Sequence, residues 1–205
     1  MIAIIDYRAG NLTSVRLAFE GLGIEARITN EPGVVHAAAR VVFPGVGAAG
    51  TAMSNLERLG LKDVIHETAA SGKPFLGICL GTQIILEHSD EDGGVDCLGI
   101  MAGNVMRFGP ADRYDKVPQM GWNQVALRRT HPVLEGIGER DEFYFDHSYY
   151  TVPEKGECVL GTTDYGIDFP SVIGKGNLVA AQFHPEKSGA PGLRILENFS
   201  RWETR

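Results

Sequence analysis

The alternation of short apolar runs with amphipathic segments over the first 88 residues restricts the fold more than any other feature of this chain. Apolar runs predict buried strands at residues 2–6, 24–29, 40–47 and 74–79. Apolar residues at helical spacing predict helices at 11–23, 51–60, 61–72 and 81–88. Strands that alternate with helices usually pair in parallel. We therefore expect an α/β fold with a largely parallel central sheet flanked by helices.

The second half of the chain has a different pattern. Short strand-like pieces, separated by Gly, Pro, Asp and Asn, occupy residues 103–108, 124–127, 142–150, 158–165 and 171–184. Such pieces predict additional antiparallel strands rather than further strand–helix–strand units. Residues 192–202 predict a final helix, and no linker or repeat interrupts the sequence. With 205 residues, we expect a single domain over 1–205.

Charge and cysteine content limit the possible partners and setting. The net charge is −7, with no Lys/Arg cluster, which argues against nucleic acid and membrane surfaces as partners. The N-terminus lacks the basic start of a signal peptide, and no apolar stretch approaches the roughly 20 residues of a membrane span. Cys79, Cys97 and Cys158 are an odd number at wide spacing, which argues against disulfides and a zinc site. We expect a cytoplasmic protein without a metal or other cofactor.

Cys79 lies where the predicted strand 74–79 meets the predicted helix 81–88, inside the sequence G-I-C-L-G. This is the form of a nucleophile elbow, in which a tight turn exposes a reactive side chain above the sheet. The start of the helix supplies N–H groups and positive partial charge, which favour a thiolate and an oxyanion. A single cysteine is more often a small buried apolar residue. Its place between Gly77 and Gly81 favours the nucleophile.

A catalytic thiol needs a base, because an unperturbed thiol with a pKa of about 8.5 is only a few per cent thiolate at neutral pH. Among the six histidines, His184 stands two residues before Glu186, across Pro185. A residue before proline favours extended backbone, and side chains two apart in extended backbone share a side. Glu186 can therefore orient the His184 imidazole. The alternative is a histidine at a strand end beside an exposed glutamate.

Gly45, Gly47 and Gly50 spell G-x-G-x-x-G between a predicted strand and a predicted helix. A dinucleotide site also requires an acidic residue about 20 positions later at a strand end, whereas Glu67 falls within a predicted helix. We therefore do not favour dinucleotide binding. A glycine loop beside the cysteine could instead offer backbone N–H groups to an oxyanion. A plain flexible turn remains an alternative.

Two aromatic segments, 116–125 and 143–150, allow two interpretations. They could pack into the core with Trp122 as the anchor. An exposed aromatic patch would instead mark an interface with a partner. The sequence leaves both open.

Several of these segments together resemble the class I (triad) glutamine amidotransferases, and within them the glutaminase subunits of imidazole glycerol phosphate synthase. The matching segments are IAIIDYRAGNLTSVRLAFE, PGVG, GICLGTQ, VPQMGWN, DHSYY and QFHPEKS, in order along essentially the whole chain. The resemblance implies hydrolysis of glutamine to glutamate and ammonia through a cysteine thioester. It also implies a heterodimer with a cyclase subunit of barrel fold. That subunit uses the ammonia to form imidazole glycerol phosphate and AICAR in histidine biosynthesis.

The resemblance also implies roles for individual residues. Cys79 would be the nucleophile, His184 the base and acid, and Glu186 its orienter. Backbone N–H groups of Val46 and Leu80 would form the oxyanion hole. The residues implied to hold glutamine are Gly47, Gln83, Glu91, His147, Ser148 and Tyr149, and those implied at the cyclase interface are Trp122, Tyr144 and Lys187. The sequence departs from the family pattern at Ala49, Thr82, Gln119 and Asp146, which leaves packing and interface details open.

Two other functions compete with this one. The chain could be the glutaminase subunit of another synthase, such as pyridoxal phosphate synthase, or a catalytically silent subunit that only binds and regulates a partner. The intact set of Cys79, His184 and Glu186 argues against the silent subunit. Val46 lies between two glycines, so its peptide can rotate easily. We therefore expect the oxyanion hole to form only when the cyclase and its ligand are docked.

Overall fold

The computed structural model describes residues 1–109 and 116–204, and an eight-stranded sheet runs through its centre. Its parallel part contains β2 (Ala26–Thr29), β1 (Ile2–Ile5), β3 (Arg40–Gly45), β4 (Phe75–Cys79) and β14 (Leu178–Ala181), in that order. The sheet continues antiparallel through β13 (Asp168–Lys175), β12 (Val159–Asp164) and β9 (Ala126–Leu127). The predicted fold class is therefore confirmed.

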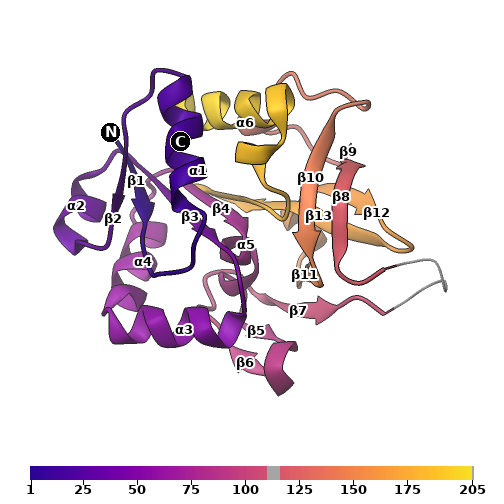
Figure 1. The fold of residues 1–205 in the computed structure, drawn as a ribbon, viewed down its shortest axis with the longest axis horizontal. Helices are drawn as coiled ribbons and strands as arrows, with labels where there is room; N and C mark the ends of the chain where they lie inside the picture. The colour runs from indigo at the N-terminus through magenta and orange to yellow at the C-terminus, as the bar shows by residue number, and fades with distance from the viewer. Residues whose placement is uncertain (110–115, 205) are drawn as a thin grey trace.

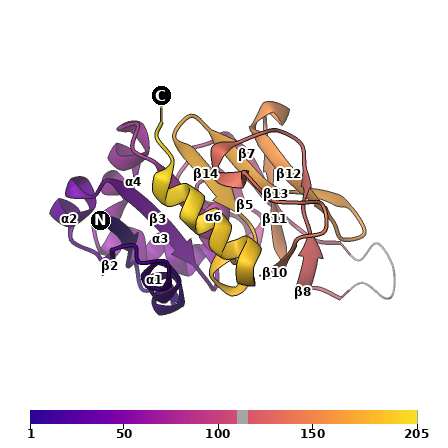
Figure 2. The same ribbon diagram turned by 90° about the horizontal axis from the view of Figure 1, so that it is seen from above.

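Helices cover both faces of the parallel part. Alternate residues of β1 explain the two layers, because Ile2 and Ile4 enter one core cluster and Ala3 and Ile5 the other. The first cluster includes side chains of α1 (Leu12–Gly21) and α6 (Gly189–Arg201), which lie together in Figures 1 and 2. The second includes side chains of α2 (Pro32–Ala37), α3 (Ala49–Arg58), α4 (Leu61–Ala70) and α5 (Leu80–Ile84).

Two smaller sheets extend the molecule. One pairs β10 (Glu142–His147) with β8 (Gln119–Gln124), and the other has the order β11 (Tyr149–Pro153), β7 (Gly103–Arg107), β5 (His88–Ser89) and β6 (Val95–Asp96). Short 3-10 turns occupy Glu91–Gly93, Pro132–Leu134, Gly156–Cys158 and Pro185–Lys187. Figure 1 shows β8, β10, β12 and β13 on the opposite side of the molecule from α2. Among the described helices, none has the length and apolar character needed to cross a membrane.

Several elements differ from the sequence prediction. The segment predicted over 171–184 divides into β13 and β14, and β14 pairs in parallel with β4, so the expectation of an antiparallel strand is wrong there. The strands β6 and β8 were not predicted. The helix predicted over 81–88 ends at Ile84, and His88 lies in β5. The chain turns away there because the Ile84 and Ile85 carbonyls accept hydrogen bonds from the loop N–H groups of Leu98, Ile100 and Met101. The helix α2, with Pro32 in its first turn, was not predicted. Its six residues are too few to establish a helical repeat in the sequence.

The carboxyl ends of β1, β3, β4 and β14 meet at one edge of the sheet, since these neighbouring strands are parallel. The segments that leave this edge are residues 7–11, 45–47, 79–80 and 182–186. In open α/β sheets this edge is where ligands usually bind. The fold therefore brings Cys79, His184 and the glycine loop together, although more than 100 residues separate His184 from Cys79 in the sequence.

Candidate active site

Cys79 is the last residue of β4, and α5 begins directly after it at Leu80. Its backbone has φ 53° and ψ −110°, an uncommon conformation for a residue with a side chain. Such a strained strand-to-helix turn is the geometry of a nucleophile elbow. The side chain is only 5% exposed but lines a pocket. The structure thus places Cys79 at the predicted junction.

Gly77 and Gly81 allow the elbow to pack tightly. A Cβ atom on Gly81 would lie 1.8 Å from the carbonyl oxygen of Phe43 in β3. A Cβ atom on Gly77 would lie 2.8 Å from the Ala180 side chain in β14. Thr82 fixes the same junction, because its hydroxyl donates to the Ala181 carbonyl at 2.6 Å. The glycines that flank Cys79 therefore let α5 lie directly against the neighbouring strands.

His184 and Glu186 form a buried pair beside Cys79. His184 Nδ1 lies 2.8 Å from Glu186 Oε1, and the two side chains are 2% and 0% exposed. Cys79 also acts on His184, since its sulfur and its charge both raise the pKa of the imidazole. The predicted alternative, a histidine beside an exposed glutamate, is therefore wrong. Cys79, His184 and Glu186 form the nucleophile–base–orienter geometry of a catalytic triad.

The surroundings of His184 favour its protonated form. Burial lowers the pKa of His184, but the hydrogen bonds with Cys79 and Glu186 and the charges of both groups outweigh burial and raise this pKa to about 10. The imidazole beside Cys79 therefore favours the cationic form. A cation in this position stabilises a thiolate.

A cavity of about 270 Å³ opens beside the Cys79 sulfur. Its lining includes the predicted nucleophile and all the residues predicted for the oxyanion hole and for holding glutamine: Val46, Gly47, Cys79, Leu80, Gln83, Glu91, His147, Ser148 and Tyr149. Pro118 and Asp146, which were not predicted, complete it. Pockets for drug-sized ligands span about 300–1,000 Å³. This cavity therefore suits a molecule of about the size of an amino acid.

The two predicted oxyanion donors differ in their orientation. Leu80 begins α5, so its N–H group has no carbonyl partner within that helix. The N–H group of Val46 instead donates to the Ala9 carbonyl at 3.0 Å. The Val46 N–H is therefore not available to the pocket in this conformation, and formation of the hole on docking of the cyclase stays a prediction. Gly45 and Gly47 on either side allow the peptide to rotate.

Glu91 contributes the carboxylate of the pocket. Its Oε2 accepts a hydrogen bond from the N–H of Ala49, the first residue of α3, at 2.7 Å. Burial raises the pKa of Glu91, against the lowering effect of that hydrogen bond, and the charge of Asp92 raises it further. The carboxylate is thus fixed at the pocket wall, where it can bind an ammonium group.

His147 is held in its neutral form at the pocket wall. Burial lowers the pKa of His147 to about 4; the contact with the Tyr149 carbonyl opposes this, while the charge of His184 adds to it. Its Nδ1 donates to the Tyr149 carbonyl at 2.8 Å. Its Nε2 lies 3.0 Å from the side-chain amide of Gln119. A neutral imidazole has one N–H, so the Gln119 amide must present its NH₂ group to Nε2.

Two amide side chains that sequence analysis missed support the triad. Gln182 is fully buried; its Nε2 donates to Cys79 Sγ at 3.9 Å and its Oε1 accepts from Gln83 Nε2 at 3.1 Å. Asn11 Nδ2 donates to Glu186 Oε1 at 2.8 Å. Both lie within segments that carry the family resemblance, but neither was assigned a role from them. The parallel pairing of β14 with β4, which sets Ala181 opposite Ile78, could have indicated Gln182 once the topology was known.

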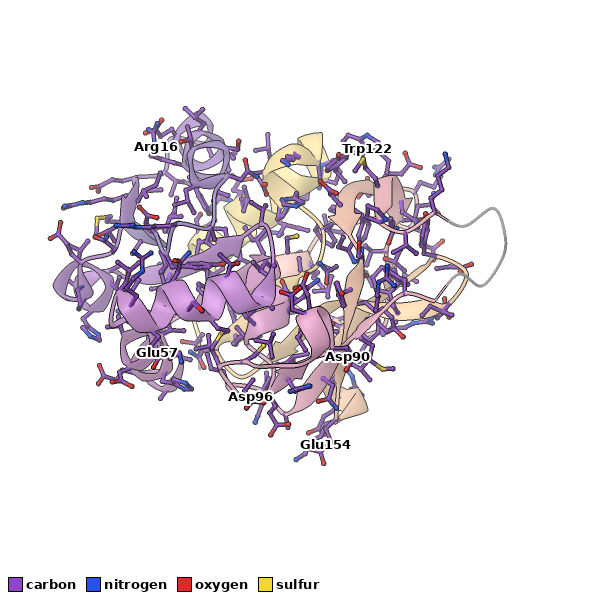
Figure 3. The ribbon with its side chains drawn as sticks, turned by 60° about the horizontal axis from the view of Figure 1, so that its bottom comes forward. Arg16, Glu57, Asp90, Asp96, Trp122 and Glu154 are labelled. Atoms are coloured by element: carbon purple, nitrogen blue, oxygen red, sulfur yellow. The ribbon has the colours of Figure 1, made fainter. Side chains whose placement is uncertain are left out.

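The aromatic segments divide between core and surface. In β10, Phe143 and Phe145 are buried, whereas the opposite side of the β8–β10 pair carries Met120 and Trp122, which are 64% and 55% exposed. Trp122 lies at the outer edge of the molecule in Figure 3. The interpretation of Trp122 as a core anchor is therefore wrong.

Tyr144 and Lys187 continue this outer surface. The rings of Trp122 and Tyr144 meet edge to face at 6.0 Å, and Lys187 Nζ lies 5.5 Å from the centre of the Tyr144 ring. The predicted interface residues Trp122, Tyr144 and Lys187 therefore form one cluster. We call Met120, Trp122, Tyr144 and Lys187 the aromatic face.

A comparison with family models matches residues 4–201 to the family Glutamine amidotransferase class-I. The chain belongs to the class I glutamine amidotransferase family. Among curated relatives, proteins named imidazole glycerol phosphate synthase subunit HisH are similar over nearly their full length. That of Aromatoleum aromaticum is 48% identical, with 98% of both chains covered. That of Moorella thermoacetica is 50% identical, with 97% of this chain and 93% of the relative covered.

Solved structures share the amidotransferase fold at lower identity. A crystal structure of a glutamine amidotransferase is 21% identical, with a TM-score of 0.71 and with 98% of this chain and 100% of that chain covered. The structure of PurLQS from Thermotoga maritima gives a TM-score of 0.73 at 14% identity, with 98% and 97% covered. At these identities the likeness extends to the fold.

Proposed function

We propose that this class I amidotransferase is the glutaminase subunit of an imidazole glycerol phosphate synthase. It hydrolyses glutamine to glutamate and ammonia and delivers the ammonia to a cyclase subunit. The observation that carries this proposal is the buried Cys79–His184–Glu186 arrangement beside an amino-acid-sized pocket. The near-half identity to proteins named imidazole glycerol phosphate synthase subunit HisH supports the choice of synthase.

The reaction starts at the Cys79 thiolate, which attacks the side-chain amide carbon of glutamine. The tetrahedral intermediate collapses as the His184 imidazolium gives its proton to the departing nitrogen, which leaves a thioester and ammonia. The neutral imidazole then removes a proton from water, which attacks the thioester and releases glutamate. Glu186 holds Nδ1–H at 2.8 Å and stabilises the imidazolium at each stage.

The pocket residues divide the recognition of glutamine. Glu91 provides a carboxylate for the ammonium group of the substrate, and Gly47, Gln83, His147, Ser148 and Tyr149 provide the remaining walls. A neutral His147 leaves the positive charge of the site on His184. The negative charge that develops on the amide oxygen is stabilised by the N–H groups of Leu80 and of a rotated Val46.

The partner is a cyclase subunit of barrel fold, bound as a heterodimer through Trp122, Tyr144 and Lys187 on the aromatic face. Exposed Trp and Met side chains beside a half-buried Tyr are of the types enriched at protein interfaces. The cyclase uses the ammonia to form imidazole glycerol phosphate and AICAR in the cytoplasm. The single chain, residues 1–205, would act as one domain in this complex.

Docking of the cyclase with its ligand would complete the site. The Val46 N–H is bound to Ala9 in this conformation, so the oxyanion hole has only one of its two donors. Removal of one oxyanion donor costs roughly 10²–10³ in turnover in a serine protease. Rotation of this peptide on docking would couple glutamine hydrolysis to the demand for ammonia.

A Cys79→Ser variant tests the chemistry in complex with a purified cyclase and its ribonucleotide substrate. We expect this variant to lose glutamine-dependent synthesis by a factor on the order of 10⁶ but to retain synthesis from added ammonium salt. The second result shows that fold and cyclase binding survive. Full glutamine-dependent turnover by Cys79→Ser would contradict the proposal. Activity of the unaltered chain only with the synthase of pyridoxal phosphate would favour the alternative subunit.

A further inference from the structure

Two buried side-chain polar atoms in residues 1–109 and 116–204 have no hydrogen-bond partner, and one of them is the hydroxyl of Tyr7. Tyr7 follows β1, is fully buried, and packs its ring against Phe43 with the ring centres 5.1 Å apart. An unpaired buried hydroxyl is unfavourable, and most such groups in folded proteins find a partner. The mechanism above gives this hydroxyl no role.

The hydroxyl of Tyr7 lies directly against the oxyanion loop. A Cβ atom on Gly45 would approach the hydroxyl oxygen to 1.9 Å and the Leu80 Cβ to 3.2 Å. Gly45 supplies the carbonyl of the peptide whose N–H belongs to Val46, and Leu80 supplies the second oxyanion donor. The unpaired hydroxyl therefore lies where the two halves of the predicted oxyanion hole meet.

Rotation of the peptide between Gly45 and Val46 creates a need for a donor here. The N–H and C=O groups of one peptide point in opposite directions. In this structure the Val46 N–H points to the Ala9 carbonyl. A rotation that turns this N–H to the pocket therefore turns the Gly45 carbonyl towards Ala9, whose own carbonyl is an acceptor. The rotated carbonyl requires a hydrogen-bond donor, and Tyr7 stands two residues before Ala9.

We propose that Tyr7 is a positioning residue that stabilises the active form of the oxyanion loop, by donating its hydroxyl to the Gly45 carbonyl after the peptide rotates. The hydroxyl would have no partner in the resting conformation and would gain one in the active conformation, which biases the rotation towards activity. Burial and the charge of Cys79 both raise the pKa of Tyr7, so the hydroxyl keeps its proton and acts as a donor. This inference rests on the proposed function.

The test is a Tyr7→Phe variant, assayed for glutamine hydrolysis in complex with the cyclase and its ribonucleotide substrate. We expect kcat to fall about tenfold, the factor that one net hydrogen bond contributes. The KM for glutamine should stay unchanged, because Tyr7 is absent from the pocket lining. The matched control is Tyr150→Phe, which removes a phenol hydroxyl from a ring packed on Phe108 and should keep the unaltered rate.

Two further measurements separate this role from others. The melting temperature of Tyr7→Phe should equal or exceed that of the unaltered chain, because the resting hydroxyl has no partner to lose. The rate at which iodoacetamide alkylates Cys79 should not change. Slower alkylation, in proportion to the lost turnover, would place the action of Tyr7 on the thiol and overturn the inference.

Equal kcat in Tyr7→Phe and in the unaltered complex would also overturn the role of Tyr7 while leaving the proposed function intact. Absence of glutamine hydrolysis in the unaltered complex would instead contradict the proposed function itself.

Discussion

A Glu186→Gln substitution separates the charge of the third triad residue from its geometry. Glu186 Oε1 accepts from His184 Nδ1 and from Asn11 Nδ2, both at 2.8 Å, whereas Oε2 is buried without a partner. A glutamine at position 186 has one oxygen and one NH₂ group. Asn11 Nδ2 donates to the atom at the place of Glu186 Oε1, so the glutamine oxygen, not its NH₂ group, must occupy that place. There the oxygen continues to accept a hydrogen bond from His184 Nδ1. The substitution therefore removes the negative charge but keeps the imidazole orientation and tautomer.

The size of the effect follows from this geometry. In a serine protease, replacing the corresponding carboxylate by an amide costs about 10⁴ in turnover, because the wrong imidazole tautomer results. Here Asn11 protects the tautomer, so we expect a smaller loss, about 10²–10³ in kcat, or roughly 3–4 kcal/mol. In the double variant Asn11→Leu with Glu186→Gln, the amide is free to turn its NH₂ group to Nδ1. We expect the double variant to lose about 10⁴.

The assay is steady-state glutamine hydrolysis in the complex with the cyclase and its ribonucleotide substrate, with Asn11→Leu alone as the control. Thermal unfolding should show that Glu186→Gln is folded, since the amide occupies the same volume. Equal kcat for Glu186→Gln and the unaltered chain would refute the role of the Glu186 charge. Equal losses in the single and double variants would refute the role of Asn11 in fixing the amide.

Three further predictions concern stability and the interface. Because the pKa of His147 is lowered to about 4, folding stability should be fully present above pH 6.5 and fall as the pH drops towards 4, by about 2 kcal/mol between pH 7 and pH 5. In urea unfolding, His147→Gln should not show this fall in unfolding free energy between pH 7 and pH 5. An equal pH dependence in the variant and the unaltered chain would contradict the role of His147. Gly81→Ala should destabilise the fold by about 3 kcal/mol, because its Cβ atom would lie 1.8 Å from the Phe43 carbonyl oxygen. This corresponds to a fall in melting temperature of about 6–12 °C. The control is Gly33→Ala, whose Cβ atom would have no atom within 4 Å, and it should be neutral or slightly stabilising. Trp122→Ala should weaken cyclase binding about 30-fold in a titration without lowering the melting temperature, whereas Leu127→Ala, also exposed but in β9, should leave the affinity unchanged.

Local sequence signals were sufficient for the strands β1 to β4 and for the turn at Cys79, but not for β14, which was expected to be antiparallel and pairs in parallel with β4. Short apolar runs and helical spacing located the strands around Cys79, and the glycines at 77 and 81 marked the turn. The end of α5 at Ile84 depended on hydrogen bonds from the loop around Leu98, which no local pattern reveals. The exposure of Trp122 depended on which side of the β8–β10 pair faces the core.

The supporting residues of the site required the tertiary structure. Gln182 reaches Cys79 because β14 pairs with β4, and Asn11 reaches Glu186 because residues after β1 and β14 leave the same edge of the sheet. The orientation of the Val46 N–H was equally hidden, because it depends on a carbonyl at Ala9, 37 residues earlier in the sequence. Contacts of this kind have no spacing or motif that sequence analysis could recognise.

The most direct test of the central claim is the rate of glutamine hydrolysis by the purified chain, measured alone and then with the cyclase and its ribonucleotide substrate. The triad is assembled in this conformation, but the Val46 N–H faces Ala9. We therefore predict slow hydrolysis by the chain alone and an increase of about 10²–10³ in the complete complex, the contribution of one oxyanion donor. Equal rates with and without the partner would contradict this account.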